Sequence, residues 1–207
     1  MIRPPPLNPR SRAAFRCAAA LTIFVVTLVG GVAPGGAALA APKSAAGSQR
    51  EYLIKAAFLY DLIKSTQWPG ESSSVIRLCT LGSDPFGAAW RSIDGRPVGA
   101  RKLRIESRVR GQPLNDCNVL FIGDSEQGRV AQILGSLDSA PVLTVSELAG
   151  FAKVGGIIRL MDYDNRLHFK VNLAAAHRMG LTISTDTLKL ADAVQVEVGA
   201  ADDASGD

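Results

Sequence analysis

Two short apolar stretches in the middle of the chain each lead into a glycine-containing turn. Residues 77–81 enter the turn 82–87, and residues 117–122 enter the turn 123–128. An uninterrupted apolar run before such a turn is typical of a buried parallel strand that leads into a helix. Two copies of this unit would place both turns at one edge of a sheet, where open α/β sheets hold their ligand crevices.

The patterns on either side predict further strands alternating with helices. Helices are expected at 51–65, 85–92, 126–137, 147–152, 174–179 and from 184 or 185 through 193, and strands at 75–81, 102–109, 117–122, 141–145, 157–161 and 167–173. The last two strands flank a short polar turn and should form an antiparallel hairpin. The fold class predicted is a single-domain α/β sandwich with a mixed, mostly parallel sheet of about five or six strands flanked by helices.

The first 40 residues have the pattern of a secretory signal peptide. They contain no acidic residue, four arginines precede an apolar run from Ala18 to Val29, and Ala38-Leu39-Ala40 supplies small residues for cleavage near Ala40. The apolar run is about half of the roughly 20 residues that a spanning helix needs. We therefore expect Sec-type export and no membrane span in the mature chain.

Removal of the signal changes the charge of the protein. The chain has 23 basic and 19 acidic residues, so losing four arginines leaves 19 of each sign. A neutral chain lacks the basic stripe that nucleic-acid binding requires. The remaining residues suffice for one domain, and we expect a flexible leader at 41–50, the α/β domain at 51–194 and a flexible acidic tail at 195–207.

The two turns are candidates for ligand binding. Glycines five positions apart also occur in phosphate loops, but such loops continue with Lys and Ser or Thr, whereas Ala88-Ala89 and Arg129-Val130 follow here. This leaves tight strand-to-helix turns, or a crevice for a small anion or polar ligand held by turn amides. The candidate crevice comprises Gly82, Ser83, Asp84, Phe86, Gly123, Ser125 and Glu126.

The sequence contains little that indicates a catalytic site or a metal site. Gly123-Asp124-Ser125 is similar to the nucleophile block of GDSL-type hydrolases, but no histidine and acid three residues apart follow near the C-terminus to activate the serine. The two histidines, His168 and His177, are nine positions apart without a cysteine or acid at metal-site spacing. We expect no catalytic residue, no metal and no cofactor.

Two cysteines, Cys79 and Cys117, remain after export into an oxidising compartment, which favours a disulfide. On aligned neighbouring strands they would be offset by about 10 Å at a rise of roughly 3.3 Å per residue. A bridge therefore requires staggered strands or a Cys117 that lies on the loop before its strand. Two buried free thiols are the alternative.

An ordered set of short segments resembles the YfiR family of periplasmic proteins. No single segment is specific, but their order is, and the resemblance covers residues 50–194. The segments are Lys55–Tyr60 with Trp68-Pro69, Leu78–Gly87, Cys117–Ile122, Pro141–Ser146, Phe151-Ala152, Gly155–Ile158 and Gly180–Ser184.

The resemblance implies a periplasmic, non-enzymatic inhibitor. Such a protein binds the periplasmic domain of an inner-membrane diguanylate cyclase, holds it inactive and so lowers cyclic di-GMP and biofilm formation, while an outer-membrane lipoprotein sequesters it. The family pattern also implies a disulfide that matches Cys79 and Cys117. A second cysteine pair, which some relatives have near 151–157, is absent from this sequence.

The surface for such a partner is sought among apolar residues of the first helix and of the C-terminal segment. Their interpretation as core residues stays open for each one, as does a homodimer. An alternative function is a small-ligand sensor that uses the crevice and passes its signal to another membrane protein. The candidate partner interface comprises Phe58, Tyr60, Leu181, Ile183, Leu188 and Leu190.

Overall fold

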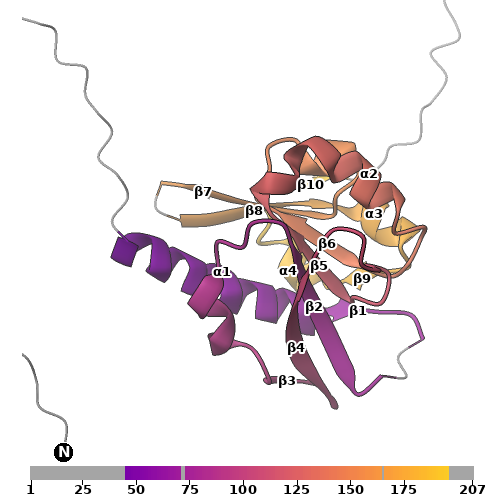
Figure 1. The fold of residues 1–207 in the computed structure, drawn as a ribbon, viewed down its shortest axis with the longest axis horizontal. Coiled ribbons are helices and arrows are strands. Elements are labelled where there is room, and N and C mark those ends of the chain that lie inside the picture. Colours follow the sequence, from indigo (N-terminus) through magenta and orange to yellow (C-terminus); the bar gives the residue numbers. More distant parts are fainter. Residues whose placement is uncertain (1–44, 71–72, 165, 196–207) are drawn as a thin grey trace, which may run out of the picture. The chain divides into compact units, whose positions relative to one another are not determined.

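A mixed eight-stranded sheet forms the centre of the domain (Figure 1) in the computed structural model, which describes residues 45–70, 73–164 and 166–195. The strand order across the sheet is β10-β8-β7-β6-β5-β2-β4-β3. The strands are β2 (Val75–Leu81), β3 (Pro97–Val98), β4 (Arg101–Arg108), β5 (Val119–Ile122), β6 (Leu143–Ser146), β7 (Ile158–Tyr163), β8 (Arg166–Asn172) and β10 (Ala193–Gln195).

The direction of the strands confirms the predicted fold class. Strands β4, β2, β5, β6 and β7 run parallel to one another, and β8 returns antiparallel to β7 as the late hairpin. Six strands have four residues or more, as expected. The two additional strands are short and lie at the two ends of the strand order, where β3 pairs antiparallel with β4 and β10 pairs parallel with β8.

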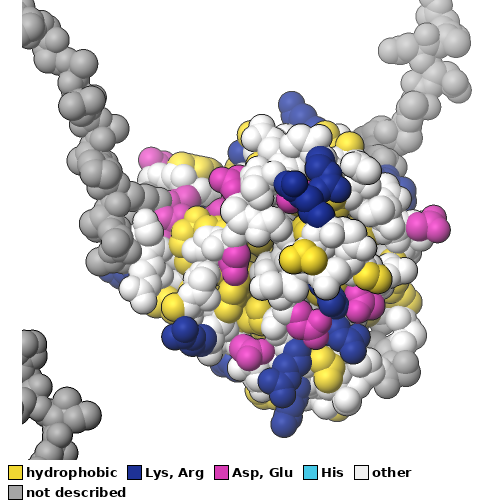
Figure 2. All heavy atoms as spheres, in the orientation of Figure 1, with side chains coloured by type: hydrophobic (Ala, Val, Ile, Leu, Met, Phe, Trp, Pro, Cys, Tyr) yellow, Lys and Arg dark blue, Asp and Glu magenta, His cyan; other side chains and the backbone are white. Residues whose placement is uncertain are grey.

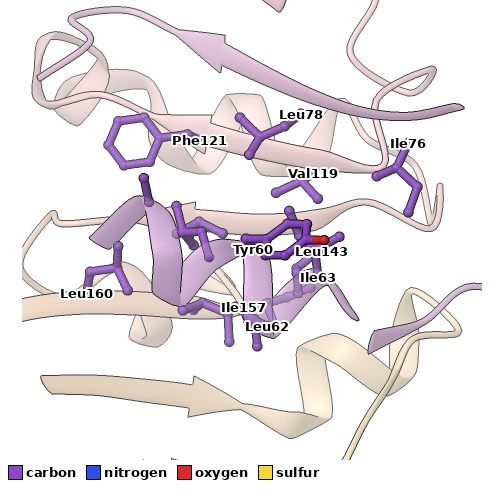
Figure 3. Packing of buried hydrophobic residues seen from close by; sticks show 14 of the residues in the cluster. Tyr60, Leu62, Ile63, Ile76, Leu78, Val119, Phe121, Leu143, Ile157 and Leu160 are labelled. Atoms are coloured by element: carbon purple, nitrogen blue, oxygen red, sulfur yellow. The ribbon is translucent and has the colours of Figure 1, made fainter. Parts of the chain in front are cut away.

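The long helix α1 (Ala45–Lys64) covers one face of the sheet. Residues such as Leu59, Leu62 and Ile63 are buried against the strands, and Figure 3 shows side chains of α1 packed among those of the sheet. The 3₁₀ helix η1 (Gly87–Ser92) lies beside α1 on the same face. A short second sheet, β1 (Thr66–Gln67) with β9 (Thr182–Ile183), holds the end of α1 against the C-terminal segment.

The opposite face packs against α2 (Val130–Gly135) and the 3₁₀ helices that flank it, η2 (Asp124–Arg129) and η3 (Phe151–Val154). Strand β5 shows why both faces are apolar: Val119 and Phe121 belong to the cluster under α1, whereas Leu120 and Ile122 belong to the cluster under α2. Successive strand residues point to opposite faces. A strand buried on both sides therefore reads as the continuous apolar run seen in the sequence.

The disulfide between Cys79 and Cys117 is present, with 5.9 Å between the two Cα atoms. Cys79 lies within β2, and Cys117 lies two positions before β5 begins, so the loop position is the one that brings the sulfurs together. Both cysteines are buried in the apolar cluster under α2. The bridge thus joins two strands that are also direct neighbours in the sheet.

Several predicted boundaries are corrected by the structure. Helix α1 begins at Ala45, inside the expected flexible leader, and the helix expected at 126–137 starts as 3₁₀ helix η2 and becomes α-helical only from Val130. The helix expected from 184 through 193 is limited to α4 (Thr185–Leu188), and β10 follows it. The short helix after the hairpin is α3 (Leu173–Arg178).

The expected signal peptide and most of the expected tail lie outside the described residues. Within the part that the structure describes, no helix combines the length and the apolar composition needed to cross a membrane.

Candidate functional site

The turns after β2 and β5 meet at the carboxyl edge of the sheet, as their repeated pattern predicts. The Ser83 amide donates a hydrogen bond to Ser125 Oγ at 2.9 Å, and the Ser125 amide donates to Ser83 Oγ at 3.3 Å. The Ser83 hydroxyl in turn donates to the Asp124 carboxylate. The two turns therefore bind each other through the amides that an anion would need.

Asp84 lies in the loop before η1, which begins at Gly87 and not at the expected position 85. Its carboxylate accepts hydrogen bonds from the Phe86 amide at 2.9 Å and from Trp90 Nε1 at 2.9 and 3.0 Å. Phe86 is buried and stacks on Trp90, with 4.0 Å between ring centroids. Trp90, which no sequence pattern selected, thus fixes the orientation of Asp84 at the sheet edge.

Glu126, another residue of the candidate crevice, is buried and is not accessible to a ligand. Its side chain is only 2% exposed and accepts hydrogen bonds from Arg110 Nε at 2.9 Å and from Arg129 Nη1 at 3.1 Å. A buried carboxylate needs such partners because desolvation of an unpaired charge is costly. Glu126 therefore anchors the second turn to the neighbouring loop.

A cavity of about 430 Å³ opens beside these turns, within the size range of small-molecule sites. Two residues of the predicted crevice, Ser83 and Asp84, line it. The rest of the lining comes from the two turns themselves, through Pro85 and Asp124, and from the sheet, the loop after β6 and α1. These additional residues are Tyr52, Pro85, Phe121, Ile122, Asp124, Glu147, Leu148 and Ala149.

The charge of the cavity does not favour the anion that glycine spacing suggests. Asp84, Asp124 and Glu147 contribute three carboxylates, and none of the described residues that line the cavity is Lys, Arg or His. The amides of Ser83 and Ser125 are already hydrogen-bonded within the turns. A phosphate or carboxylate group would be repelled here.

A buried ion pair connects the cavity to α1. Lys55 is 2% exposed, and its ammonium group donates hydrogen bonds to Glu51 on the same helix and to Glu147 on the loop after β6. The Tyr52 hydroxyl donates to Glu147 at 3.3 Å, and Lys55 Nζ lies 4.6 Å from the centroid of the Tyr52 ring. Glu147 is thus shared between the cavity wall and the helix.

The candidate partner interface divides into core and surface. Tyr60, Leu181 and Ile183 are buried, and Phe58 is half-buried against Phe169 with 4.6 Å between ring centroids. Leu188 is also half-buried, and Leu190 is 74% exposed. In this structure only the last of the six offers a largely accessible apolar side chain.

Two other apolar residues of α1 are accessible instead. Leu53 is 42% exposed and Ile54 is 51% exposed, and the neighbouring Ala57 is exposed as well. Charged groups of both signs are interspersed on the face of the molecule drawn in Figure 2. On the outer side of α1, Leu53, Ile54 and Ala57 form a short apolar patch between the exposed Arg50 and Asp61, and we call this patch the α1 strip.

The hairpin and the chain after α4 form a polar cluster of their own. His168 Nδ1 lies 2.7 Å from Asp192 Oδ1, and the His168 ring stacks on Tyr163 with 3.5 Å between centroids. The pKa of the Asp192 carboxyl lies below its ordinary value, first because it is hydrogen-bonded to His168, while burial opposes the shift. Burial and the nearby Asp192 charge raise the pKa of Tyr163. Among the described residues, no three metal-binding side chains converge.

The protein is thus an α/β domain with one disulfide. Two parts of its surface could bind another molecule: the cavity at the sheet edge and the α1 strip. The chain belongs to the YfiR/HmsC-like family, whose model matches residues 52–192. This family is one of periplasmic regulators of diguanylate cyclase signalling.

Similar solved structures are distant. A conserved domain protein from Vibrio cholerae shares 8% identity at a TM-score of 0.46 over 70% of this chain and 60% of that one. The ABC domain in complex with L-Trp from Streptococcus pneumonia shares 13% identity at a TM-score of 0.47 over 65% and 58% of the two chains. The chain thus spans less than two thirds of the length of either structure.

Proposed function

We propose that the mature chain represses an inner-membrane diguanylate cyclase by binding its periplasmic domain. The observation that supports this is the family match over 52–192, which spans nearly all of the described domain. Repression of this kind requires tighter binding to the inactive state of the cyclase than to the active one. A difference of about 3 kcal/mol gives a shift of roughly 150-fold. Lower cyclic di-GMP and less biofilm would follow.

The α1 strip is the proposed contact surface. Accessible apolar side chains on a regular helix can enter a groove of a partner, and the energy of such contacts comes from burying them. Leu190 extends the proposal to the C-terminal segment, as expected from the sequence, whereas Tyr60, Leu181 and Ile183 are buried and belong to the core. A lipoprotein that sequesters the protein would compete for the same strip.

The test is a comparison of two lysine substitutions at equally exposed positions. Ile54→Lys should raise cyclic di-GMP in the native host towards the level of a deletion strain and should abolish recovery of the cyclase from solubilised inner membrane. Val154→Lys, on η3 and also 51% exposed, should behave as wild type. Both variants should unfold at the wild-type temperature because neither side chain is part of the core.

Repression that survives Ile54→Lys would remove the α1 strip from the proposal. Cyclic di-GMP that is unchanged by deletion of the gene would remove cyclase repression itself. In that case the alternative is a small-ligand sensor acting on another membrane protein, and the observation that favours it is the cavity at the sheet edge.

A further inference from the structure

The cavity at the carboxyl edge of the sheet has the composition of a binding site for an organic cation. Its walls combine apolar surface with three carboxylates, as described above, and the only ammonium group nearby, among the described residues, is that of Lys55. We propose that this cavity binds a small molecule with an ammonium head and an apolar body. The proposal does not depend on which membrane protein is the partner.

All three carboxylates accept hydrogen bonds, and Glu147 is paired with the charged Lys55, whereas the donors to Asp84 and Asp124 are neutral. Asp84 accepts from an amide and an indole, and Asp124 accepts from a hydroxyl. Neutral donors leave the negative charge of both groups in place. The Coulomb attraction of an ammonium ion to each of these carboxylates is stronger in the partly desolvated cavity than in bulk water. The potential in the cavity thus selects cations.

The apolar residues of the cavity wall would contact the apolar body of the ligand. Phe121, Ile122 and Leu148, which are buried, line the floor of the cavity, and Tyr52 lines it from α1. Aromatic faces attract cations, and this ring already has Lys55 Nζ at 4.6 Å. A methylene chain or ring of the ligand can displace water from the floor while its head stays among the carboxylates.

Glu147 gives ligand binding a route to α1. Its carboxylate lines the cavity and at the same time binds the buried ammonium group of Lys55. A second ammonium group in the cavity competes with Lys55 for this carboxylate and leaves Lys55 with Glu51. If the proposed function holds, an organic cation therefore changes how α1 is held and, through the α1 strip, the affinity for the partner.

The test uses three probes that share a six-carbon chain and differ only in the head group. The mature protein, purified from the periplasm and labelled with ¹⁵N, is titrated with hexylamine, hexanol and hexanoate at pH 7. Hexylamine should bind about tenfold more tightly than hexanol, and hexanoate most weakly, with amide shifts at Ser83, Asp124 and Leu148. Equal or tighter binding of hexanoate would overturn the proposal.

Substitutions locate the site and test the competition. Asp124→Asn and Glu147→Gln should each weaken hexylamine at least threefold, whereas Glu106→Gln on β4, outside the cavity, should leave it unchanged. Lys55→Met should tighten hexylamine because it frees Glu147. Hexylamine binding that is unaltered in both cavity variants would overturn the site, and weaker binding in Lys55→Met would overturn the competition. No partner protein enters these measurements, so their failure is distinct from failure of the repressor proposal.

Discussion

Gly123, in the turn after β5, packs directly against the backbone of Ser83 in the turn after β2. A Cβ atom added there would lie 1.9 Å from the backbone oxygen of Ser83 and 2.9 Å from its nitrogen. Backbone atoms cannot move aside as a flexible side chain can, and Ser83 is also held by its bonds to Ser125 and Asp124. Glycine is needed here for close approach rather than for an unusual dihedral angle.

Gly123→Ala should destabilise the protein by about 3 kcal/mol, at the upper end of the range for overpacking. This corresponds to a fall of about 6–12 °C in the unfolding midpoint of a domain of this size, measured by thermal unfolding of the mature protein.

The control is Gly128→Ala, because a Cβ atom at Gly128 would meet nothing within 4 Å. This change should leave the midpoint unchanged or raise it slightly, since alanine restricts the unfolded chain. Equal midpoints for the two variants would contradict the contact between the turns.

At the scale of elements, the segment after α4 shows how a side chain can override a helical pattern. The Asp192 amide donates to the Phe169 carbonyl at 3.0 Å, and the Asp192 carboxylate accepts from the Phe169 amide at 3.0 Å. Asp192 thereby provides hydrogen-bond partners for the backbone N–H and C=O groups of Phe169 in β8, just before β10 begins. Residues 189–193 have good helical propensity, but these bonds give them an extended partner instead.

Asp192→Ala should weaken this attachment in a pH-dependent way. A carboxyl whose pKa is lower in the folded state stabilises the protein fully above its unfolded value of about 3.9, and this contribution disappears as the pH falls through the folded value. At pH 7 the variant should lose about 1 kcal/mol, the low end for a charge-assisted bond, because the group is partly exposed. Thermal unfolding between pH 7 and pH 3 measures the difference.

Asp186→Ala is the matched control, since this aspartate on α4 is highly exposed and contacts only Lys189. Its midpoint should follow that of the wild type at every pH. A constant gap between wild type and Asp192→Ala down to pH 3 would show that the carboxylate charge is not what attaches the segment.

The sequence predicts those elements whose own residues form a recognisable hydrophobic pattern. Strands β2 and β5 are continuous apolar runs, and the hairpin has a polar turn between two alternating segments, so all three were predicted within one or two residues. Strand β10 was missed because its stability comes from β8 and Asp192 and not from its own composition. Local pattern cannot show an interaction that arises only after folding.

The candidate site was predictable in the same partial way. The meeting of the two turns followed from parallel strands ending at one edge. Tyr52 and Glu147 could not be found because they are brought together across a separation of 95 positions. The charge of the cavity, and therefore the class of ligand proposed for it, depends on that long-range contact.

At the scale of the whole domain, the disulfide joins β2 to the loop before its neighbour β5. Cys79 and Cys117 are 38 positions apart, and two strands between them, β3 and β4, extend the sheet on the far side of β2. A crosslink of this length restricts the unfolded chain by about 4 kcal/mol in the chain-entropy model.

The double variant Cys79→Ala, Cys117→Ala should therefore lose about 4 kcal/mol, or about 8–16 °C in the unfolding midpoint. It should keep the fold, because both positions stay apolar within the cluster under α2. Reduction of the wild-type protein should lower its midpoint by a similar amount and should leave the double variant unaffected. A midpoint equal to that of the oxidised wild type would contradict a stabilising role.

Helix α1 is held in place by residues that lie far from it in the sequence. It comes first in the described sequence, but the residues that cover it come late: Glu147 holds Lys55 from 92 positions away, and Thr187 donates to Ser65 from 122 positions away. If the chain is exported from its N-terminus, as its first 40 residues predict, this helix would emerge with its apolar side chains uncovered and could pack only after nearly all of the domain had crossed the membrane. The segment that we propose as the partner contact would then also be the part of the domain that needs protection from aggregation for the longest time.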